Sequence, residues 1–444
     1  MAAGRPAPAS TAAGTVSPAR ACAFAVLRRV FEQGAYADRA LQSEAAGLDR
    51  RERSLAMALA YGAVQRRATL DHVASRLSDR PVSNLDPPVL AALRLGLLQL
   101  LFLDGIAEHA AVHESVELAK RGGRGGAGLV NAVLRRATRE GQAILDALSD
   151  ETPAGAATLH SAPLWLAELW WRELGSEQAR ALLARVNEPA ESALRVNTLV
   201  SSVDDVLAEL PVAARAVAQL PEALVLEAPF DVHGSELWRR GAIMAQSRAS
   251  MLAGRALAPL PGDRVLDLCA APGAKTTQLA ALMGDQGELT AVERHPGRAR
   301  GLRETLERMR VGCATVAVAD AAAVGVATHS GYDRVLVDPP CSGLGTLQSR
   351  PDLRWRTSPE RIAELARLQA RILRAGARTT APGGALVYSV CTISTAEGER
   401  VIESFLAEHA DFAIEGPFLR PLPHPDGTDG FFIARLRRDG HGAR

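Results

Sequence analysis

Two cysteines stand directly after apolar segments that are typical of buried strands. Cys341 lies in the sequence DPPCSG (338–343), which follows the apolar run YDRVLV, and Cys391 ends the similar segment GALVYSVC. A cysteine thiolate is a nucleophile that can form a covalent intermediate with a substrate. The competing interpretation is a pair of structural thiols, because free cysteine is often buried. A carboxylate, two prolines and a thiol form an unusual strand end, which favours chemistry.

Acidic residues also follow the apolar segments of this region. Glu293, Asp320 and Asp338 each stand at the end of such a segment. Ligands of doubly wound sheets bind at the carboxyl ends of the strands, where an acid suits ribose hydroxyls. A later acid can accept a hydrogen bond from the amino group of adenine. One such acid could simply cap a helix, but three in succession favour a ligand site.

The first loop of this region, within DLCAAPGAKTT (267–277), consists mainly of small residues. It is neither the G-x-G-x-x-G of dinucleotide sites nor a Walker A loop, which needs glycine where Cys269 and Ala274 stand. Backbone N–H groups that open a helix can still bind a carboxylate. The small loop and the acids together predict an S-adenosylmethionine site. Its loop residues are Cys269, Ala270, Ala271, Pro272, Gly273, Ala274 and Lys275.

The elements that position these residues alternate in type from residue 262 onward. Short apolar segments typical of strands alternate with segments of helical period, which predicts a parallel sheet with helices on both faces. A late strand at 429–438 is expected to be antiparallel. The expected strands are 263–269, 287–293, 313–320, 332–340 and 383–391, and the helices 275–284, 296–310 and 359–379.

The first part of the chain has a different pattern. Residues 20–145 show apolar residues at helical spacing in about five segments, which predicts a helical bundle. The composition of 149–163 indicates a linker. Residues 163–255 begin with a helix and continue with two strand-like segments around a helical one, which predicts a small α+β module.

Charge and cysteine content limit the classes of function. The 444 residues carry 51 Lys and Arg and 50 Asp and Glu, but residues 1–145 hold 19 basic and 13 acidic residues, a balance of +6 that can attract a polyanion. Five widely spaced cysteines argue against a disulfide framework and for a reducing cytoplasm. The most apolar segment, 89–103, is too short to span a bilayer. His109, His113 and Glu117 have a possible metal spacing, but we expect no metal.

The motifs together resemble those of a known enzyme family. CAAPGAK, DPPCSG and YSVCT are similar to motifs of the RNA 5-methylcytosine methyltransferases. RLGLLQLLFLDGIAEHAAVHESVELAK and GLVNAVLRR resemble the NusB-like domain that is fused to such enzymes in bacteria. Over residues 20–437 the chain resembles the small-subunit (16S) ribosomal RNA methyltransferase B family, the Fmu or Sun group.

The resemblance implies a fold and a division of the chain. We expect a Rossmann-like α/β S-adenosylmethionine methyltransferase domain, preceded by an all-α NusB-like bundle and the small α+β module. The cofactor is S-adenosylmethionine, bound by the loop 269–275, Glu293, Asp320 and Asp338. The expected partner is 16S ribosomal RNA, without membrane or metal, and the protein is expected to be a monomer. The divisions are a disordered tail 1–19, the NusB-like RNA-binding domain 20–148, the module 163–255 and the catalytic domain 256–444.

The resemblance also gives the cysteines their roles. Carbon 5 of cytosine is a poor nucleophile, and a thiolate that adds to carbon 6 makes it able to attack a methyl group. The RNA family pattern matches the nucleophile to Cys391 and leaves release of the product to Cys341, whereas the pattern of DNA enzymes would make Cys341 the nucleophile. Asp338 is expected to contact the base as a neutral acid or as an acceptor, and Lys275 to orient Asp338 or the substrate.

Two positions depart from the family pattern, and other functions remain open. The family usually has Gly where this chain has Ala274, and Asp where it has Ser247. Ala274 must therefore have ordinary backbone angles or the loop must be rearranged. Methylation of an exocyclic nitrogen is disfavoured, because no aromatic residue follows DPP before Trp355. The alternatives are a non-catalytic NusB-like RNA-binding factor and the same chemistry on tRNA.

Overall fold

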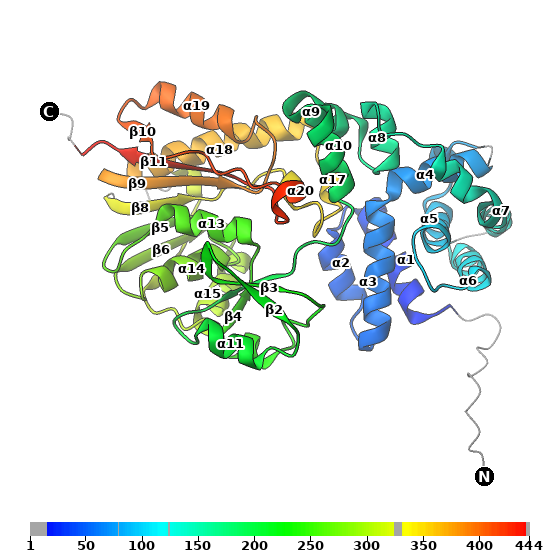
Figure 1. The fold of residues 1–444 in the computed structure, drawn as a ribbon, viewed down its shortest axis with the longest axis horizontal. Coiled ribbons are helices and arrows are strands. Elements are labelled where there is room, and N and C mark those ends of the chain that lie inside the picture. The colour runs from blue at the N-terminus through cyan, green and yellow to red at the C-terminus, as the bar shows by residue number, and fades with distance from the viewer. Residues whose placement is uncertain (1–15, 79, 123–124, 324–330, 441–444) are drawn as a thin grey trace, which may run out of the picture. The chain divides into compact units, whose positions relative to one another are not determined.

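The computed structural model describes residues 16–78, 80–122, 125–323 and 331–440 (Figure 1). The described residues form two compact units, 16–187 with 350–356, and 188–349 with 357–440. Residues 1–15 of the expected tail 1–19 lie outside the described residues. Its last two residues already belong to helix α1 (Pro18–Gln33), which has proline at its first position.

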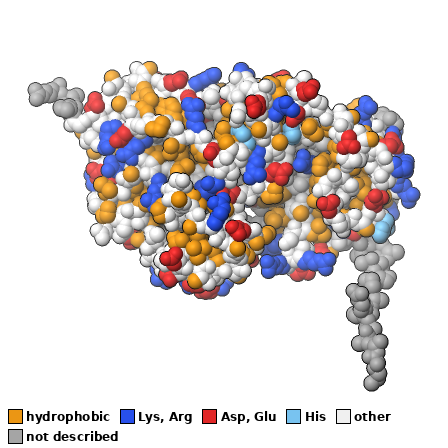
Figure 2. All heavy atoms as spheres, viewed as in Figure 1, with side chains coloured by type: hydrophobic (Ala, Val, Ile, Leu, Met, Phe, Trp, Pro, Cys, Tyr) orange, Lys and Arg blue, Asp and Glu red, His pale blue; other side chains and the backbone are white. Residues whose placement is uncertain are grey.

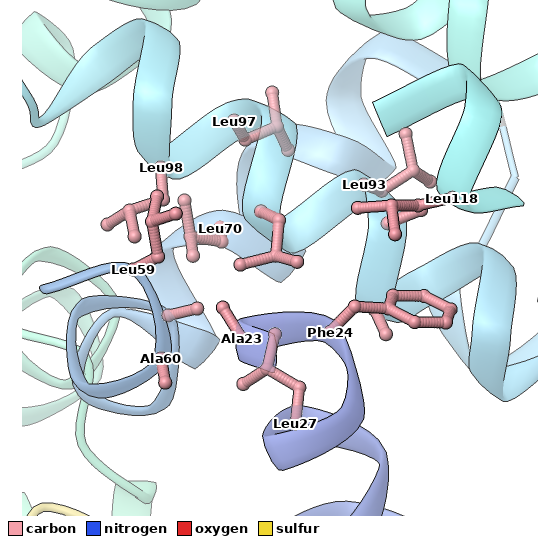
Figure 3. Packing of buried hydrophobic residues seen from close by; sticks show 14 of the residues in the cluster. Ala23, Phe24, Leu27, Leu59, Ala60, Leu70, Leu93, Leu97, Leu98 and Leu118 are labelled. Carbon is pink, nitrogen blue, oxygen red and sulfur yellow. The ribbon is translucent and has the colours of Figure 1, made fainter. Parts of the chain in front are cut away.

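The helical unit is built around one largely apolar helix. Helix α5 (Pro87–Leu101) starts after Asp86 with two prolines and buries most of its residues, as expected for a central helix. Leu93, Leu97 and Leu98 of α5 pack against side chains of the surrounding helices (Figure 3). These helices are α1, α2 (Ala37–Glu44), α3 (Arg50–Gln65), α4 (Arg67–Ser78), α6 (Glu108–Arg121) and α7 (Ala127–Asp146).

The predicted linker at 149–163 is wrong, because this segment contains a packed helix. Helix α8 (Pro153–Leu159) starts at Thr152, whose hydroxyl accepts from the N–H of Gly155 at 3.1 Å. The carbonyl oxygen of Thr158 accepts from the hydroxyl of Thr69 on α4 at 2.6 Å. The small residues that resemble a linker instead allow close helix packing.

A small four-stranded sheet lies within the predicted module 163–255. Helices α9 (Leu164–Leu174) and α10 (Ser176–Arg185) precede this sheet and group by their contacts with the helical unit. The sheet is antiparallel, in the order β2-β3-β1-β4, and helix α11 (Val203–Glu209) packs on it. Its strands are β1 (Ala193–Val196), β2 (Ala214–Val217), β3 (Leu220–Leu226) and β4 (Ile243–Ala245).

The seven-stranded sheet confirms the predicted α/β fold. Its order is β10-β11-β9-β8-β5-β6-β7, in which β9, β8, β5, β6 and β7 pair in parallel and β11 pairs antiparallel with both β9 and the edge strand β10. The late strand was therefore predicted correctly. The bounds are β5 (Arg264–Leu268), β6 (Glu288–Glu293), β7 (Ala314–Val318), β8 (Tyr332–Val337), β9 (Thr380–Val390), β10 (Phe412–Ile414) and β11 (Phe432–Arg438).

Helices cover both faces of this sheet (Figure 1). Alternate residues of β8 point to opposite faces, so Val335 and Val337 pack with α18 (Pro359–Thr379) and α19 (Glu399–Glu408). Leu336 packs with α13 (Arg248–Leu257) and α14 (Ala274–Leu282) on the other face. Helix α15 (Pro296–Arg308) packs near β6 and β7. The carboxyl ends of the parallel strands consequently meet along one edge.

Candidate active site

The loop after β5 is shaped by backbone angles that favour small residues. Cys269 has φ +66° and Gly273 has φ +107°. A Cβ atom on Gly273 would lie 2.8 Å from the side chain of Leu302, so the position needs glycine for space as well. Ala274 is the first residue of α14 and has ordinary helical angles. The departure from the family pattern at Ala274 therefore leaves the loop unstrained at that residue.

A pocket opens beside this loop. Its polar part includes Glu293 and Asp320, while Leu368 and Ile372 of α18 add apolar walls. Carboxylates beside apolar walls suit a ribose and a flat heterocycle. The remaining lining residues are Cys269, Val292, Arg294, His295, Arg298, Ala321 and Pro340.

The two acids of the pocket also stabilise their own loops. Glu293 ends β6, and its Oε1 accepts from the N–H of His295 at 2.8 Å. Asp320 lies two residues beyond β7, and its Oδ1 accepts from the N–H of Ala322 at 3.0 Å. Asp320 thus combines a capping role with its place in the pocket lining, whereas Glu293 lines the pocket and binds the N–H of His295 just before α15.

Arg298 is a pocket residue that the sequence analysis missed. Its guanidinium donates to the carbonyl oxygen of Ala271 at 2.7 Å and lies 3.4 Å from the carboxylate of Glu293. Arg298 therefore ties the loop after β5 to the end of β6. The signal available in the sequence was weak, because an arginine in the first turns of a helix is ordinarily a surface residue.

The sulfur atoms of Cys341 and Cys391 lie 3.2 Å apart, and both side chains are partly buried. The loops after β8 and β9 bring them together because these strands are neighbours in the sheet. The hydrogen bond with Cys391, followed by burial and nearby negative charge, raises the pKa of the Cys341 thiol well above its usual value. The raised pKa keeps Cys341 protonated at neutral pH, and the two sulfurs lie within hydrogen-bond distance of each other.

Lys275 and Asp338 form an ion pair beside the thiols. The Nζ atom of Lys275 lies 2.8 Å from Oδ2 of Asp338. Burial lowers the pKa of Lys275, but the charge and hydrogen bond of Asp338, with a smaller effect of Cys391, raise it overall. The lysine is therefore an ammonium, and its Nζ also lies 5.3 Å from the ring centroid of Phe431.

Asp338 is held by donors on both of its oxygens. Its Oδ1 accepts from the hydroxyl of Ser389 at 2.8 Å, and its Oδ2 accepts from Lys275. Ser389 is fully buried on β9, two residues before Cys391 and thus on the same side of the strand. This arrangement favours the acceptor role of Asp338 over the neutral-acid role. The sequence analysis missed Ser389, although its spacing from Cys391 was a usable signal.

The buried carboxyl group of Asp267 and the partly buried thiol of Cys269, both near the loop after β5, have pKa values above their usual ranges. Burial raises the pKa of Asp267 to about 7, against a hydrogen bond from Thr276 at 2.7 Å. Burial, with the charge of Asp338 next, raises the pKa of Cys269 to about 12. The sulfur of Cys269 is therefore a protonated thiol, which fits a loop that contributes its backbone.

The other singled-out residues lie elsewhere. Ser247 caps α13 and accepts from the N–H of Ser250 at 3.4 Å. His109 and His113 are exposed on α6. In the described part of the chain, no group of three or more His, Cys, Asp or Glu side chains is placed to hold a metal ion. None of the helices described is long and apolar enough to cross a membrane.

Three family models match the chain. The 16S rRNA methyltransferase RsmB/F model matches residues 254–437, and the NusB family model matches residues 17–139. A model for the ferredoxin-like domain of the RsmF/B-like methyltransferases matches residues 162–233. The matches confirm the NusB-like and methyltransferase resemblances that the motifs indicated.

Similar proteins cover almost the whole chain. A probable ribosomal RNA small subunit methyltransferase B of Synechocystis sp. is 37% identical, over 95% of this chain and 99% of its own length. One of Bacillus subtilis is 34% identical with the same coverage. The crystal structure of PH0851 is 27% identical with a TM-score of 0.81, covering 96% of this chain and 99% of its own. The chain is an enzyme that belongs to the RsmB/F family of rRNA methyltransferases.

Proposed function

We propose that the protein transfers a methyl group from S-adenosylmethionine to carbon 5 of a cytosine in 16S ribosomal RNA, through a covalent bond between Cys391 and carbon 6. The observation that carries the proposal is the contact of two thiols, 3.2 Å apart, at the same sheet edge as the Lys275–Asp338 ion pair. Two thiols beside an ion pair suit the covalent addition of a thiolate to a nucleobase and the later elimination of that thiolate.

The pocket beside the loop after β5 fits the adenosine part of the methyl donor. Glu293 would accept from the ribose hydroxyls and Asp320 from the adenine amino group, between the apolar walls of Leu368 and Ile372. S-Adenosylmethionine, when bound, supplies an electrophilic methyl group. The backbone of residues 270–274 at the start of α14 would hold its carboxylate.

The thiol of Cys341 prepares Cys391 for attack. Because Cys341 keeps its proton, its S–H group stabilises a thiolate on Cys391. The Cys391 thiolate adds to carbon 6, and carbon 5 then has the electron density to take up the methyl group. The ammonium of Lys275 offsets negative charge on the base during the addition.

Release of the product uses the second thiol. Once Cys391 is bonded to carbon 6 it bears no charge, so its own contribution to the raised pKa of Cys341 weakens, while burial, Glu397 and Asp338 still raise that pKa. Cys341 can then lose its proton to water. Its thiolate takes the proton from carbon 5, the C5–C6 double bond reforms, and Cys391 leaves as a thiolate.

Asp338 distinguishes cytosine from uracil in this proposal. Its carboxylate is fixed by Lys275 and Ser389 and can accept from the exocyclic amine of cytosine. Methylation of that amine is disfavoured by the place of Trp355, the first aromatic residue after DPP. Trp355 donates to the carbonyl oxygen of Val64 within the helical unit at 2.7 Å.

The substrate is proposed to be 16S ribosomal RNA, with the helical unit as its anchor. On the face shown in Figure 2, Lys and Arg side chains are spread among acidic and apolar ones. What supports the anchor is the charge of residues 1–145, with 19 basic and 13 acidic residues, because a net positive charge suits contacts to RNA phosphates rather than to sequence. The target cytosine must leave its base stack for a thiol to reach carbon 6, so a single-stranded loop is the expected target.

A tritium-release assay tests this function. RNA with tritium on carbon 5 of cytosine should release tritium when wild-type protein and S-adenosylmethionine are present, and Cys391→Ala should release none. Absence of tritium release with both 16S rRNA and tRNA would favour the non-catalytic RNA-binding alternative. Bisulfite sequencing of rRNA from a deletion strain then identifies the cytosine, and an unchanged rRNA would contradict the proposed substrate.

A further inference from the structure

A buried carboxylate lies behind the two thiols and contacts the residue that follows each of them. Glu397 is fully buried in the loop after β9. Its Oε1 accepts from the N–H of Ser342 at 2.8 Å, and its Oε2 accepts from the Ser342 hydroxyl at 2.5 Å. The Thr392 hydroxyl lies 3.0 Å from the same Oε2 and 2.8 Å from the Ser342 hydroxyl oxygen. One carboxylate thus joins the residues next to Cys341 and Cys391.

Glu397 is itself held from two further directions. The side-chain amide of Gln369 on α18 donates to Oε1 at 2.9 Å. The hydroxyl of Tyr388 on β9 donates to the carbonyl oxygen of Glu397 at 2.6 Å. An ionised carboxylate only accepts hydrogen bonds, so it matches a site surrounded by donors. An amide in its place would direct an N–H group toward one of those donors.

The position of this network indicates what it does. Cys341 and Cys391 are 50 residues apart, and contact between their sulfurs depends on how the two loops meet. A second link, from the N–H of Gly345 to the carbonyl oxygen of Cys391 at 3.0 Å, joins the same loops. Glu397 has no exposed surface, so it cannot contact a substrate directly. Its role must therefore be exerted through the residues that it holds.

We infer that Glu397 is a positioning residue that holds the Cys341 thiol against Cys391, and that its loss impairs release of the methylated base more than its formation. The inference rests on the proposed function. Cys341 only assists the addition of Cys391 to carbon 6, whereas removal of the carbon 5 proton requires Cys341 itself beside the adduct. A looser pair of loops therefore slows the second step in particular.

Binding of phenylarsine oxide tests the geometry without RNA. The arsenical condenses with two adjacent thiols to give two As–S bonds and water. Wild type should bind one equivalent by intact mass, and Cys341→Ala should bind none. Glu397→Gln should bind about 10–100-fold more weakly, as when a group that orients metal ligands is removed. Glu399→Gln is the matched control. Glu399 lies two residues after Glu397 in the sequence, but it pairs with Arg420 at 2.8 Å.

A denaturing gel with labelled RNA and S-adenosylmethionine tests the step that is affected. Glu397→Gln should accumulate a covalent protein–RNA complex and lower kcat with an unchanged KM for S-adenosylmethionine. Thr392→Val keeps the charge of Glu397 and removes one hydrogen bond, so it should give the same defect more weakly, and Thr392→Ser should restore release. If Glu397→Gln does not fold, comparison of Thr392→Val with Thr392→Ser still tests whether the network positions Cys341 for release.

The outcomes separate the inference from the proposed function. If wild type releases no tritium but Glu397→Gln still loses arsenical binding, the function fails and the positioning role stands. Wild-type arsenical binding and wild-type release in both Glu397→Gln and Thr392→Val would overturn the positioning role while leaving the function intact. Loss of folding in Glu397→Gln together with equal behaviour of Thr392→Val and Thr392→Ser would also overturn it.

Discussion

The site has a cofactor half, with the pocket acids Glu293 and Asp320, and a thiol half, with Cys341, Cys391 and the Lys275–Asp338 ion pair. The two halves are built in different ways. In the cofactor half, Glu293 and Asp320 accept hydrogen bonds from residues two positions further along the chain. In the thiol half the bonds join residues far apart, such as Lys275 with Asp338 and Ser342 with Glu397, which are 63 and 55 positions apart. The effects of two substitutions in the cofactor half should therefore be additive, whereas the effects of two substitutions in the thiol half should be coupled and non-additive.

The two cysteine variants should break the thiol half most severely and in different ways. Cys391→Ala cannot form the adduct, so activity should fall by about 10⁴-fold or more and no covalent complex should appear. Cys341→Ala can still add and transfer the methyl group but releases slowly, so a protein–RNA complex should survive denaturing electrophoresis. A complex with Cys391→Ala and none with Cys341→Ala would reverse the roles, in agreement with the DNA-enzyme pattern.

Substitutions around the Lys275–Asp338 ion pair should have coupled effects on kcat. Ser389→Ala removes one donor from Asp338, and Asp338→Asn removes the charge that pairs with Lys275. Each should lower kcat by about 100-fold, because small displacements in a catalytic site are costly. The double variant should be little worse than either single one. Additive losses in kcat, measured by tritium release, would show that Ser389 does not act through Asp338.

The sequence predicted the fold and the cofactor half better than the thiol half. Strand alternation and strand-end acids are local signals, and they gave the parallel sheet and the pocket acids. Ser389 and Glu397 were missed because Asp338 and Ser342, which they contact, are distant in sequence and become neighbours only in the folded sheet, and Arg298 was missed because its sequence context is that of a surface arginine. The predicted linker was wrong for a related reason, since the contact between Thr69 and Thr158 that holds α8 spans 89 residues.

Asp267 lies between the two halves and should make stability depend on pH. Its pKa is about 7 when folded, against 3.8 when exposed, so the folded state favours the protonated form. The stability that this provides is complete below pH 4 and is lost as the pH rises through 7. Between pH 5 and 8, wild type should therefore lose about 2 kcal/mol relative to Asp267→Asn. Urea unfolding at both pH values measures the difference, and parallel curves for the two proteins would contradict it.

The cofactor half should respond to substitution least and most simply. Asp320→Ala removes an acceptor for the adenine amino group and should weaken S-adenosylmethionine binding by about 1–2 kcal/mol, and Glu293→Gln should do likewise through the ribose. Each acid bonds to its own loop, so the double variant should show the sum of the two losses within about 0.5 kcal/mol. Titration calorimetry on the folded proteins measures all three affinities, with Glu399→Gln as a control that should bind the cofactor normally, because Glu399 pairs with Arg420 outside the pocket. A coupling energy well above that limit would mean that the two acids hold the pocket jointly, as the thiol half does.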